Sequence, residues 1–176
     1  MTVPSATWEQ VRQRASFACE YCAVTETDAG GQLTVDHFQP KTQNGTDDLD
    51  NLIYCCFRCN LYKHNYWPGT PDDPQLWNPR REPATRHFVE LGNGSLHPLT
   101  LIASFTIRLL RLNRPPLVAW RFRRRELIEE SRLLERYRDL LRLLAELDRA
   151  KAAVLQEQQR LLAEQRRMLD LLLGGG

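Results

Sequence analysis

The last third of the sequence carries a long seven-residue repeat of apolar positions. Apolar residues, mostly leucines, recur in adjacent columns from Leu127 to Leu172. One column consists of Leu133, Leu140, Leu147, Val154, Leu161 and Met168. Positions seven residues apart fall on the same side of an α-helix. The pattern therefore predicts one helix of more than 50 residues, which starts at the prolines 115–116 and ends before the glycines 174–176.

This apolar stripe needs something to cover it. The other substantial helix that the pattern predicts, near residues 100–112, is too short for that purpose. We therefore expect a second copy of the chain, as in a homodimer, or another protein to dock on residues 127–172. The alternative is a helix that folds back on itself near residues 150–153.

The first hundred residues show shorter patterns, with apolar runs separated by glycine, proline and asparagine. Because these residues interrupt helices and strands, the pattern predicts short strands and helices rather than one repeated element. The predicted elements are a helix at 7–16, strands at 33–38 and 51–55, a helix at 57–65, a hairpin formed by 87–91 and 95–97, and the helix near 100–112. The fold class is α+β. Its segments are residues 1–80, an extension at 81–116 with the hairpin and a helix, and the long amphipathic helix at 117–176.

All five cysteines lie between Cys19 and Cys59, and four of them form two C-x2-C pairs. An odd number of cysteines makes a poor disulfide framework, whereas two such pairs can close a tetrahedral site around Zn²⁺. We expect Cys19, Cys22, Cys56 and Cys59 to bind one structural zinc ion. Because Cys55 is adjacent to Cys56, an exchange between these two as ligand stays open.

The net charge of +2 hides an uneven distribution. Residues 1–80 carry −4, residues 81–125 carry +7 and residues 126–176 carry −1. Within the basic segment, the run 121–125 contains Arg121, Arg123, Arg124 and Arg125 with an interleaved aromatic residue. Such a cluster can contact a nucleic-acid backbone, although a solvated helix face is the plain alternative.

The N-terminus has no basic and apolar leader pattern, and no window reaches the roughly 18 apolar residues that span a bilayer. We expect a cytoplasmic protein, with no membrane as partner.

The central segment resembles the HNH endonucleases of the ββα-metal superfamily. The resemblance is carried by Cys19-Glu-Tyr-Cys22, Val35-Asp-His-Phe38, Asn51-Leu and Cys56-Phe-Arg-Cys59-Asn60-Leu-Tyr-Lys63. It covers roughly residues 8–80. A weaker similarity at residues 77–80 and 112–115 extends it to small bacterial stand-alone HNH proteins. The resemblance implies that residues 1–80 form a zinc-stabilised ββα-metal nuclease domain.

The resemblance also implies roles for the residues at the strand ends. Asp36 is expected to bind the catalytic cation, and His37 to act as the general base that activates water. Asn51 matches the middle asparagine of the motif, whose side-chain oxygen holds the histidine ring in orientation.

The helix after the second cysteine pair is expected to complete the site. Asn60 matches the second metal ligand, and His64, four residues later on the same helical face, is a candidate third ligand or phosphate contact. Lys63 is a candidate contact to the nucleic acid. Oxygen ligands from Asp36 and Asn60 favour Mg²⁺ or Mn²⁺ as the catalytic ion.

These expectations combine into a metal-dependent endonuclease that hydrolyses phosphodiester bonds in DNA by a one-metal mechanism, with RNA not excluded as a substrate. A non-catalytic, zinc-stabilised nucleic-acid-binding or scaffold subunit of a larger complex is the alternative. No base-reading element is recognisable, which motivates a third hypothesis: a bacterial effector of antiviral defence whose activity a partner gates. The aromatic residues Trp8, Tyr21, Tyr54, Trp67 and Trp77 are assigned to the core rather than to base stacking.

Overall fold

The computed structural model describes residues 3–173, which divide into two units at the boundary between Arg124 and Arg125. Residues 1–2 and 174–176, at the ends of the predicted segments 1–80 and 117–176, lie outside the described residues. The glycines expected to follow the long helix are among them. The segment boundaries predicted at 80 and 116 stay a prediction.

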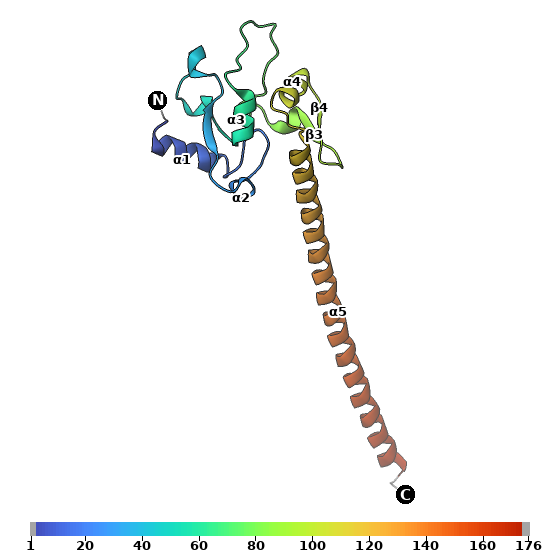
Figure 1. Cartoon of the computed structure of the whole chain (residues 1–176). Helices are drawn as coiled ribbons and strands as arrows, with labels where there is room; N and C mark the ends of the chain where they lie inside the picture. Colours follow the sequence, from blue (N-terminus) through green and yellow to red (C-terminus); the bar gives the residue numbers. More distant parts are fainter. Residues whose placement is uncertain (1–2, 174–176) are drawn as a thin grey trace. The chain divides into compact units, whose positions relative to one another are not determined.

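The first part of unit one is a small ββα arrangement. Strand β1 (Thr34–His37) pairs antiparallel with β2 (Leu52–Cys55), so that His37 lies opposite Leu52. Helix α3 (Phe57–Lys63) follows β2 after one residue, and α1 (Ser5–Arg14) packs against both strands (Figure 1). All four residues of β2 are buried, which makes this strand the centre of the core. The predicted helix at 57–65 is therefore real but ends two residues early.

The segment between the first cysteine pair and β1 contains a helix that the sequence pattern did not predict. Helix α2 (Glu26–Ala29) has a capping box, in which Thr25 and Asp28 each satisfy a backbone amide of the other, and it stops at Gly30 in the left-handed conformation. Glu26 accepts a bidentate ion pair from Arg12, with nitrogen–oxygen distances of 2.6 and 2.7 Å. This pair ties α2 to α1.

Short 3-10 turns shape the loop between the two strands. They are η1 (Lys41–Gln43) and η2 (Leu49–Asn51), and a third turn, η3 (Ala84–Arg86), precedes the hairpin. Each lies in a stretch that the sequence predicts to be irregular or leaves without an element. The loop that connects β1 to β2 is thus structured at both of its ends.

The second part of unit one contains the predicted hairpin. Strands β3 (Phe88–Glu90) and β4 (Leu96–Pro98) pair antiparallel, and helix α4 (Leu101–Leu109) follows with Thr100 as its side-chain cap. In the turn between the strands, Gly94 has φ +82°. A Cβ at this position would lie 2.4 Å from the carbonyl oxygen of Val118 and 2.8 Å from the amide nitrogen of Phe122. The turn therefore contacts the backbone of the helix that follows α4 directly.

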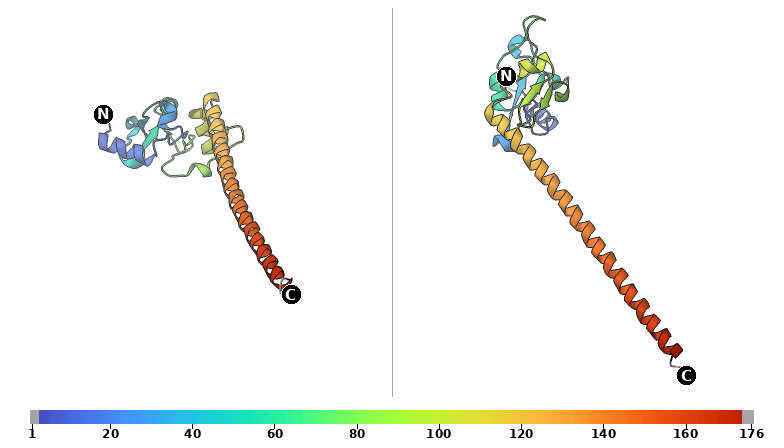
Figure 2. Two further views of the ribbon diagram at one scale, coloured as in Figure 1. Left: turned by 90° about the horizontal axis from the view of Figure 1, so that it is seen from below. Right: turned by 90° about the vertical axis from the view of Figure 1, so that its right-hand side faces the viewer.

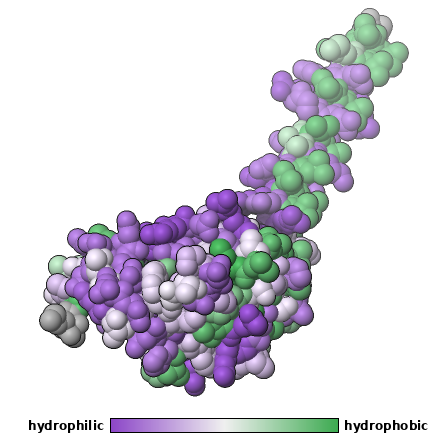
Figure 3. All heavy atoms as spheres, turned by 90° about the horizontal axis from the view of Figure 1, so that it is seen from above, coloured by the Kyte–Doolittle hydropathy of each residue, from purple (hydrophilic) through white to green (hydrophobic). Residues whose placement is uncertain are grey.

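That helix, α5 (Pro115–Leu173), is continuous over 59 residues, which confirms the predicted long helix and excludes a reversal near residues 150–153 (Figure 2). Its heptad leucines are exposed within the structure: Leu133 by 64%, Leu147 by 64% and Leu162 by 58%. Apolar side chains form green clusters along the helix in Figure 3. No helix in residues 3–173 is both long and apolar enough to cross a membrane.

Candidate functional site

Four cysteines from two distant parts of the sequence meet in the core of unit one. The sulfurs of Cys19, Cys22, Cys56 and Cys59 all lie within 4.8 Å of one another, and all four residues are buried. The Sγ atoms of Cys22 and Cys56 are 3.7 Å apart. A zinc ion with four thiolates at about 2.3 Å in tetrahedral geometry holds its sulfurs about 3.8 Å apart. The cluster therefore fits a closed structural zinc site.

The local backbone explains why Cys56 rather than Cys55 joins this group. Cys55 is the last residue of β2, lies opposite Thr34 in the strand register and is fully buried away from the cluster. Cys56 is the N-cap of α3, where its Sγ accepts a hydrogen bond from the backbone amide of Cys59 at 3.4 Å. The ambiguity between the two cysteines is thereby resolved.

The electrostatics differ among the four sulfurs: burial foremost raises the pKa of the Cys19 thiol and the hydrogen bond with Cys19 foremost raises that of Cys59, whereas the pKa values of Cys22 and Cys56 are lowered. Hydrogen bonds from the neighbouring cysteines, Cys19 foremost, lower the pKa of the Cys56 thiol far below its usual range. Burial lowers the basicity of the Arg114 guanidinium, but the negative charge of the cysteines, Cys59 first, outweighs this effect and raises its pKa. Four thiolates around one Zn²⁺ carry a net charge of −2, so a nearby arginine is a suitable counter-charge. No pattern in the sequence indicates this role for Arg114.

At the end of β1, Asp36 faces helix α3. Its Oδ2 atom lies 2.8 Å from the ammonium nitrogen of Lys63, whose side chain has no exposed surface. The same ammonium donates a hydrogen bond of 2.6 Å to the carbonyl oxygen of His37. The contact to Asp36 is an ion pair without the alignment of a hydrogen bond, which leaves Oδ2 buried and without an aligned donor. Such an oxygen is suited to a cation.

The prediction that Lys63 contacts nucleic acid is wrong, because a side chain that is fully enclosed cannot reach a phosphate backbone. The reason lies in the helix phase. Cys56, Cys59 and Lys63 are spaced by three and four residues, so they share one face of α3, and the zinc ligands turn that face inward. Lys63 is carried into the core with them, where it neutralises Asp36.

His37 makes a contact that the sequence did not predict. Its Nε2 atom lies 2.7 Å from Oδ1 of Asp47, while the other carboxylate oxygen of Asp47 lies 2.7 Å from the ammonium of Lys41. Hydrogen bonds from Lys41 first and His37 second lower the pKa of Asp47, so it is ionised at neutral pH. An ionised carboxylate only accepts hydrogen bonds. His37 therefore presents an N–H at Nε2, which leaves Nδ1 as the acceptor nitrogen of the neutral ring.

Asn51 does not contact the ring of His37 through its side-chain oxygen. That oxygen accepts a hydrogen bond of 2.8 Å from the amide of Gln39, and its amide nitrogen donates to the carbonyls of Gln39 and Thr46 at 3.1 and 2.8 Å. The prediction that Asn51 orients the ring directly is corrected accordingly. Asn51 braces both ends of the loop that carries Asp47, and Asp47 is the residue that holds the ring.

On α3, Asn60 is half-buried and lies one turn before Lys63, so it shares the helix face that reaches Asp36. The helix ends at Lys63, and His64 follows as an exposed residue with φ 49° and ψ −140°. Its amide still donates the helical hydrogen bond of 2.9 Å to the carbonyl oxygen of Asn60, and the metal role of His64 stays a prediction.

The predicted basic cluster separates into different environments. Arg121 is buried, and its guanidinium donates to the carbonyl oxygens of Gly94 at 2.8 Å and Leu112 at 2.5 Å. The prediction that Arg121 binds nucleic acid is wrong, since its buried guanidinium fastens the start of α5 to the hairpin turn at Gly94 and to the segment after α4 at Leu112. Arg123 and Arg124 are exposed, and Arg125 is half-buried. For these three the assignment stays a prediction.

Comparison with known families agrees with the site. Residues 19–66 match the family model described as HNH endonuclease, a span that includes all four zinc-site cysteines, Asp36, His37 and Asn60. Among curated proteins, a search with the whole chain finds no match. The family consists of nucleases that bind divalent metals and act on nucleic acids. This chain therefore contains an HNH endonuclease domain at residues 19–66.

Proposed function

We propose that this protein is a divalent-metal-dependent endonuclease that hydrolyses phosphodiester bonds in DNA, with His37 as the general base. The observation that carries the proposal is the contact of 2.7 Å between His37 Nε2 and Asp47, at the residue that follows the partly buried Asp36 in β1. It supplies a histidine of fixed tautomer beside a group that suits a cation. A general base needs that combination of position and protonation state.

In this proposal, Nδ1 of His37 accepts a proton from the attacking water as the water oxygen bonds to phosphorus. The bond from phosphorus to the 3′ oxygen breaks, and that oxygen leaves with the electron pair. Asp47 stabilises the imidazolium that forms. Because half of the Asp47 side chain is exposed, at 51%, solvent screening keeps this contribution modest. Asn51 holds the loop, so that Asp47 stays within reach of the ring.

Asp36 and Asn60 are the residues that would hold the catalytic ion. Their oxygen atoms suit Mg²⁺ or Mn²⁺. When bound, such an ion stabilises the negative charge that develops on the phosphate and on the leaving oxygen. Lys63 balances the charge of Asp36 from the core side, so the carboxylate is already positioned before any ion arrives.

The second candidate is a non-catalytic nucleic-acid-binding or scaffold subunit, which the exposed apolar stripe of α5 favours. Within that stripe, Leu133, Leu140 and Leu161 are each half or more exposed, at 64, 57 and 50%. A stripe sustained over six heptads is typical of a helix that packs on another helix. We propose a second copy of the chain as its occupant, and light scattering over a range of protein concentrations tests this. A monomer at every concentration would overturn it, and a complex with another protein would then be the alternative.

Cleavage assays separate the two candidates. Purified protein is incubated with plasmid DNA, single-stranded DNA or RNA, with and without Mg²⁺ or Mn²⁺. We expect metal-dependent nicking of the plasmid, and a loss of at least about a hundredfold in the His37→Ala variant, the usual contribution of a general base. His97→Ala, at an exposed hairpin histidine, is the matched control. A His37→Ala protein that cuts at the wild-type rate would refute the assignment.

A nuclease with no recognisable base-reading element endangers its own cell. We therefore extend the proposal to a gated effector of antiviral defence in the bacterial cytoplasm. Plating of bacteriophage on cells that express the wild-type or the His37→Ala protein tests this extension. Equal plaque numbers on the two strains would count against it.

A further inference from the structure

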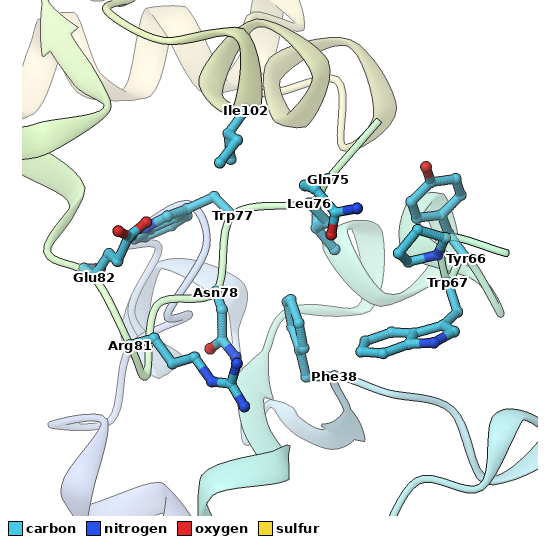
Figure 4. A pocket seen from close by; sticks show the side chains of 11 residues that line it. Phe38, Tyr66, Trp67, Gln75, Leu76, Trp77, Asn78, Arg81, Glu82 and Ile102 are labelled. Atoms are coloured by element: carbon cyan, nitrogen blue, oxygen red, sulfur yellow. Dashed lines mark hydrogen bonds between the residues drawn. The ribbon is translucent and has the colours of Figure 1, made fainter. Parts of the chain in front are cut away.

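A cavity of about 460 Å³ has part of its wall at the end of β1, one residue after the proposed general base. Its lining begins at Phe38, the residue after His37, and includes Trp67, Trp77, Asn78 and Arg81 (Figure 4). Neighbouring Cα atoms lie about 3.8 Å apart, so the backbone of the cavity wall adjoins that of His37, and a nucleic-acid strand that crosses the end of β1 would pass both residues. Its volume falls in the range of pockets that bind small organic groups.

The aromatic walls of the cavity are held in place. Phe38 and Trp67 meet edge to face with ring centroids 5.9 Å apart and an interplanar angle of 88°. Trp77 is buried, and its indole N–H donates a hydrogen bond of 3.0 Å to the carbonyl oxygen of Glu82. The hydroxyl of Tyr66 donates to the carbonyl of Pro74. Rings fixed in this way lose little entropy when a ligand enters between them.

Trp67 is the residue that core packing explains least. The sequence assigns it to the core, but it is only half-buried and does not pack against the core cluster. Its one ring contact within residues 3–173 is the edge-to-face pair with Phe38. A large aromatic side chain at the wall of a cavity, outside the core, is a suitable platform for a flat ligand.

Polar groups without partners lie at the same cavity. The side-chain amide nitrogen of Asn78 and the guanidinium of Arg81 have no hydrogen-bond or ion-pair partner in the described part of the chain. The carboxylate of Glu82 is already used by His87 at 2.7 Å. The open groups are therefore hydrogen-bond donors, and one carries positive charge. In the view of Figure 4, Asn78 and Arg81 extend along the edge of the cavity below Trp77.

We propose that this cavity binds one unstacked nucleobase of the substrate strand, next to the phosphate that His37 addresses. The inference rests on the proposed nuclease function. Aromatic faces stack on any base, and donors at the rim suit the carbonyl and ring-nitrogen acceptors of a base edge. A base inside a duplex must first unstack and unpair. The protein should therefore prefer single-stranded or locally unpaired nucleic acid over a perfect duplex.

The test measures binding of full-length protein by fluorescence anisotropy. All proteins carry His37→Ala, so that the ligand is not cut. The probes are a single-stranded oligothymidylate and a strand of the same length built from abasic nucleotides, which offers the phosphate backbone alone. Trp67→Ala removes the stacking platform, and Arg81→Ala changes an exposed side chain that folding does not require. Phe57→Ala, at an aromatic residue that is 69% exposed and does not line the cavity, is the control.

We expect Trp67→Ala to weaken binding to oligothymidylate by about tenfold, the typical effect of losing one stacked base. Binding to the abasic strand should not change, and Phe57→Ala should behave like the parent on both probes. Arg81→Ala should weaken binding to oligothymidylate more than to the abasic strand. Circular dichroism and zinc content confirm that each variant is folded.

Equal losses on both probes for Trp67→Ala and Arg81→Ala would overturn the base-binding inference, since the two residues would then act on the backbone. The proposed nuclease function would still stand if the wild-type protein nicks plasmid. Failure of the wild-type protein to bind or cut any nucleic acid would overturn both.

Discussion

Replacement of Cys56 by alanine should abolish zinc binding and folding of the HNH domain, whereas replacement of its neighbour Cys55 should do neither. Both residues are buried cysteines at adjacent positions, so the pair is a matched comparison. Cys56 belongs to the four-sulfur cluster and Cys55 does not. The two substitutions therefore remove the same atoms, and their effects differ through the metal and through the cap hydrogen bond that Cys56 accepts from the Cys59 amide.

The expected magnitudes are far apart. Binding of a structural Zn²⁺ supplies about 10–16 kcal/mol in small zinc domains, which equals or exceeds the 5–15 kcal/mol by which ordinary domains are stable. The segment of residues 19–66 is too short to replace that with a larger apolar core. The free energy of zinc binding that is lost with the ligand Cys56 is thus larger than the free energy of unfolding of the domain. Loss of the Cys55 sulfur leaves a small cavity and costs about 1–2 kcal/mol.

The assay combines zinc content per chain, measured with a colour-forming chelator, and thermal unfolding followed by circular dichroism. Wild-type and Cys55→Ala proteins should contain one zinc ion and unfold cooperatively, with a slightly lower Tm for the variant. The Cys56→Ala protein should contain little zinc, and its β1–β2 and α3 signals should be lost while the helical signal of α5 persists. A Cys56→Ala protein with full zinc content and an unchanged Tm would refute the four-sulfur assignment.

Three further predictions follow from other contacts. Lys63→Met keeps the aliphatic stem but leaves the Asp36 carboxylate without its buried cation. In urea unfolding, the zinc-loaded variant without Mg²⁺ should be about 2–3 kcal/mol less stable than the wild type and should regain part of this with Mg²⁺; unchanged stability would contradict this. Glu20→Gln weakens the ion pairs to Arg80 at 2.8 Å and Arg14 at 3.5 Å, both partly screened by solvent, and should cost about 1–2 kcal/mol in the same assay, whereas an unaltered midpoint would argue against these pairs. Burial first, and then the hydrogen bond to Glu26, raises the pKa of Tyr54 to about 12. The contribution of the protonated phenol to stability is therefore present below the unfolded pKa of about 10 and is lost as the pH rises from 10 to 12. The wild-type protein should lose stability relative to Tyr54→Phe over that window, and parallel pH curves would show that the phenol is not protected.

Much of the fold follows from local sequence signals. The cysteine spacing predicts the zinc cluster, and the apolar runs at 33–38 and 51–55 predict the two strands that carry Asp36 and His37. The uninterrupted heptads predict α5 over its whole described length. Each of these signals depends on residues close in sequence or on a ligand set of known chemistry, which is why sequence reasoning finds them.

The errors at Lys63 and Arg121 have a common physical cause, which is helix phase. A charged residue is assigned to the surface by default, but its direction is set by the neighbours that share its helix face. Lys63 follows the zinc ligands inward, and Arg121 lies four residues after the buried Leu117. The spacing of Cys59 and Lys63 contained this information. The partner of His37 had no such signal, because Asp47 reaches the ring through a loop without periodicity.

The turn at Gly94 has a consequence for how this protein can vary over evolutionary time. Where two elements meet through side chains, a change on one side can be matched by a change on the other. Here the hairpin meets the backbone of α5 with no side chain of its own between them, and a Cβ would stand 2.4 Å from the carbonyl oxygen of Val118. No compensating substitution in the helix can move a carbonyl group away. The position at which α5 begins is therefore fixed by one residue that has no acceptable replacement.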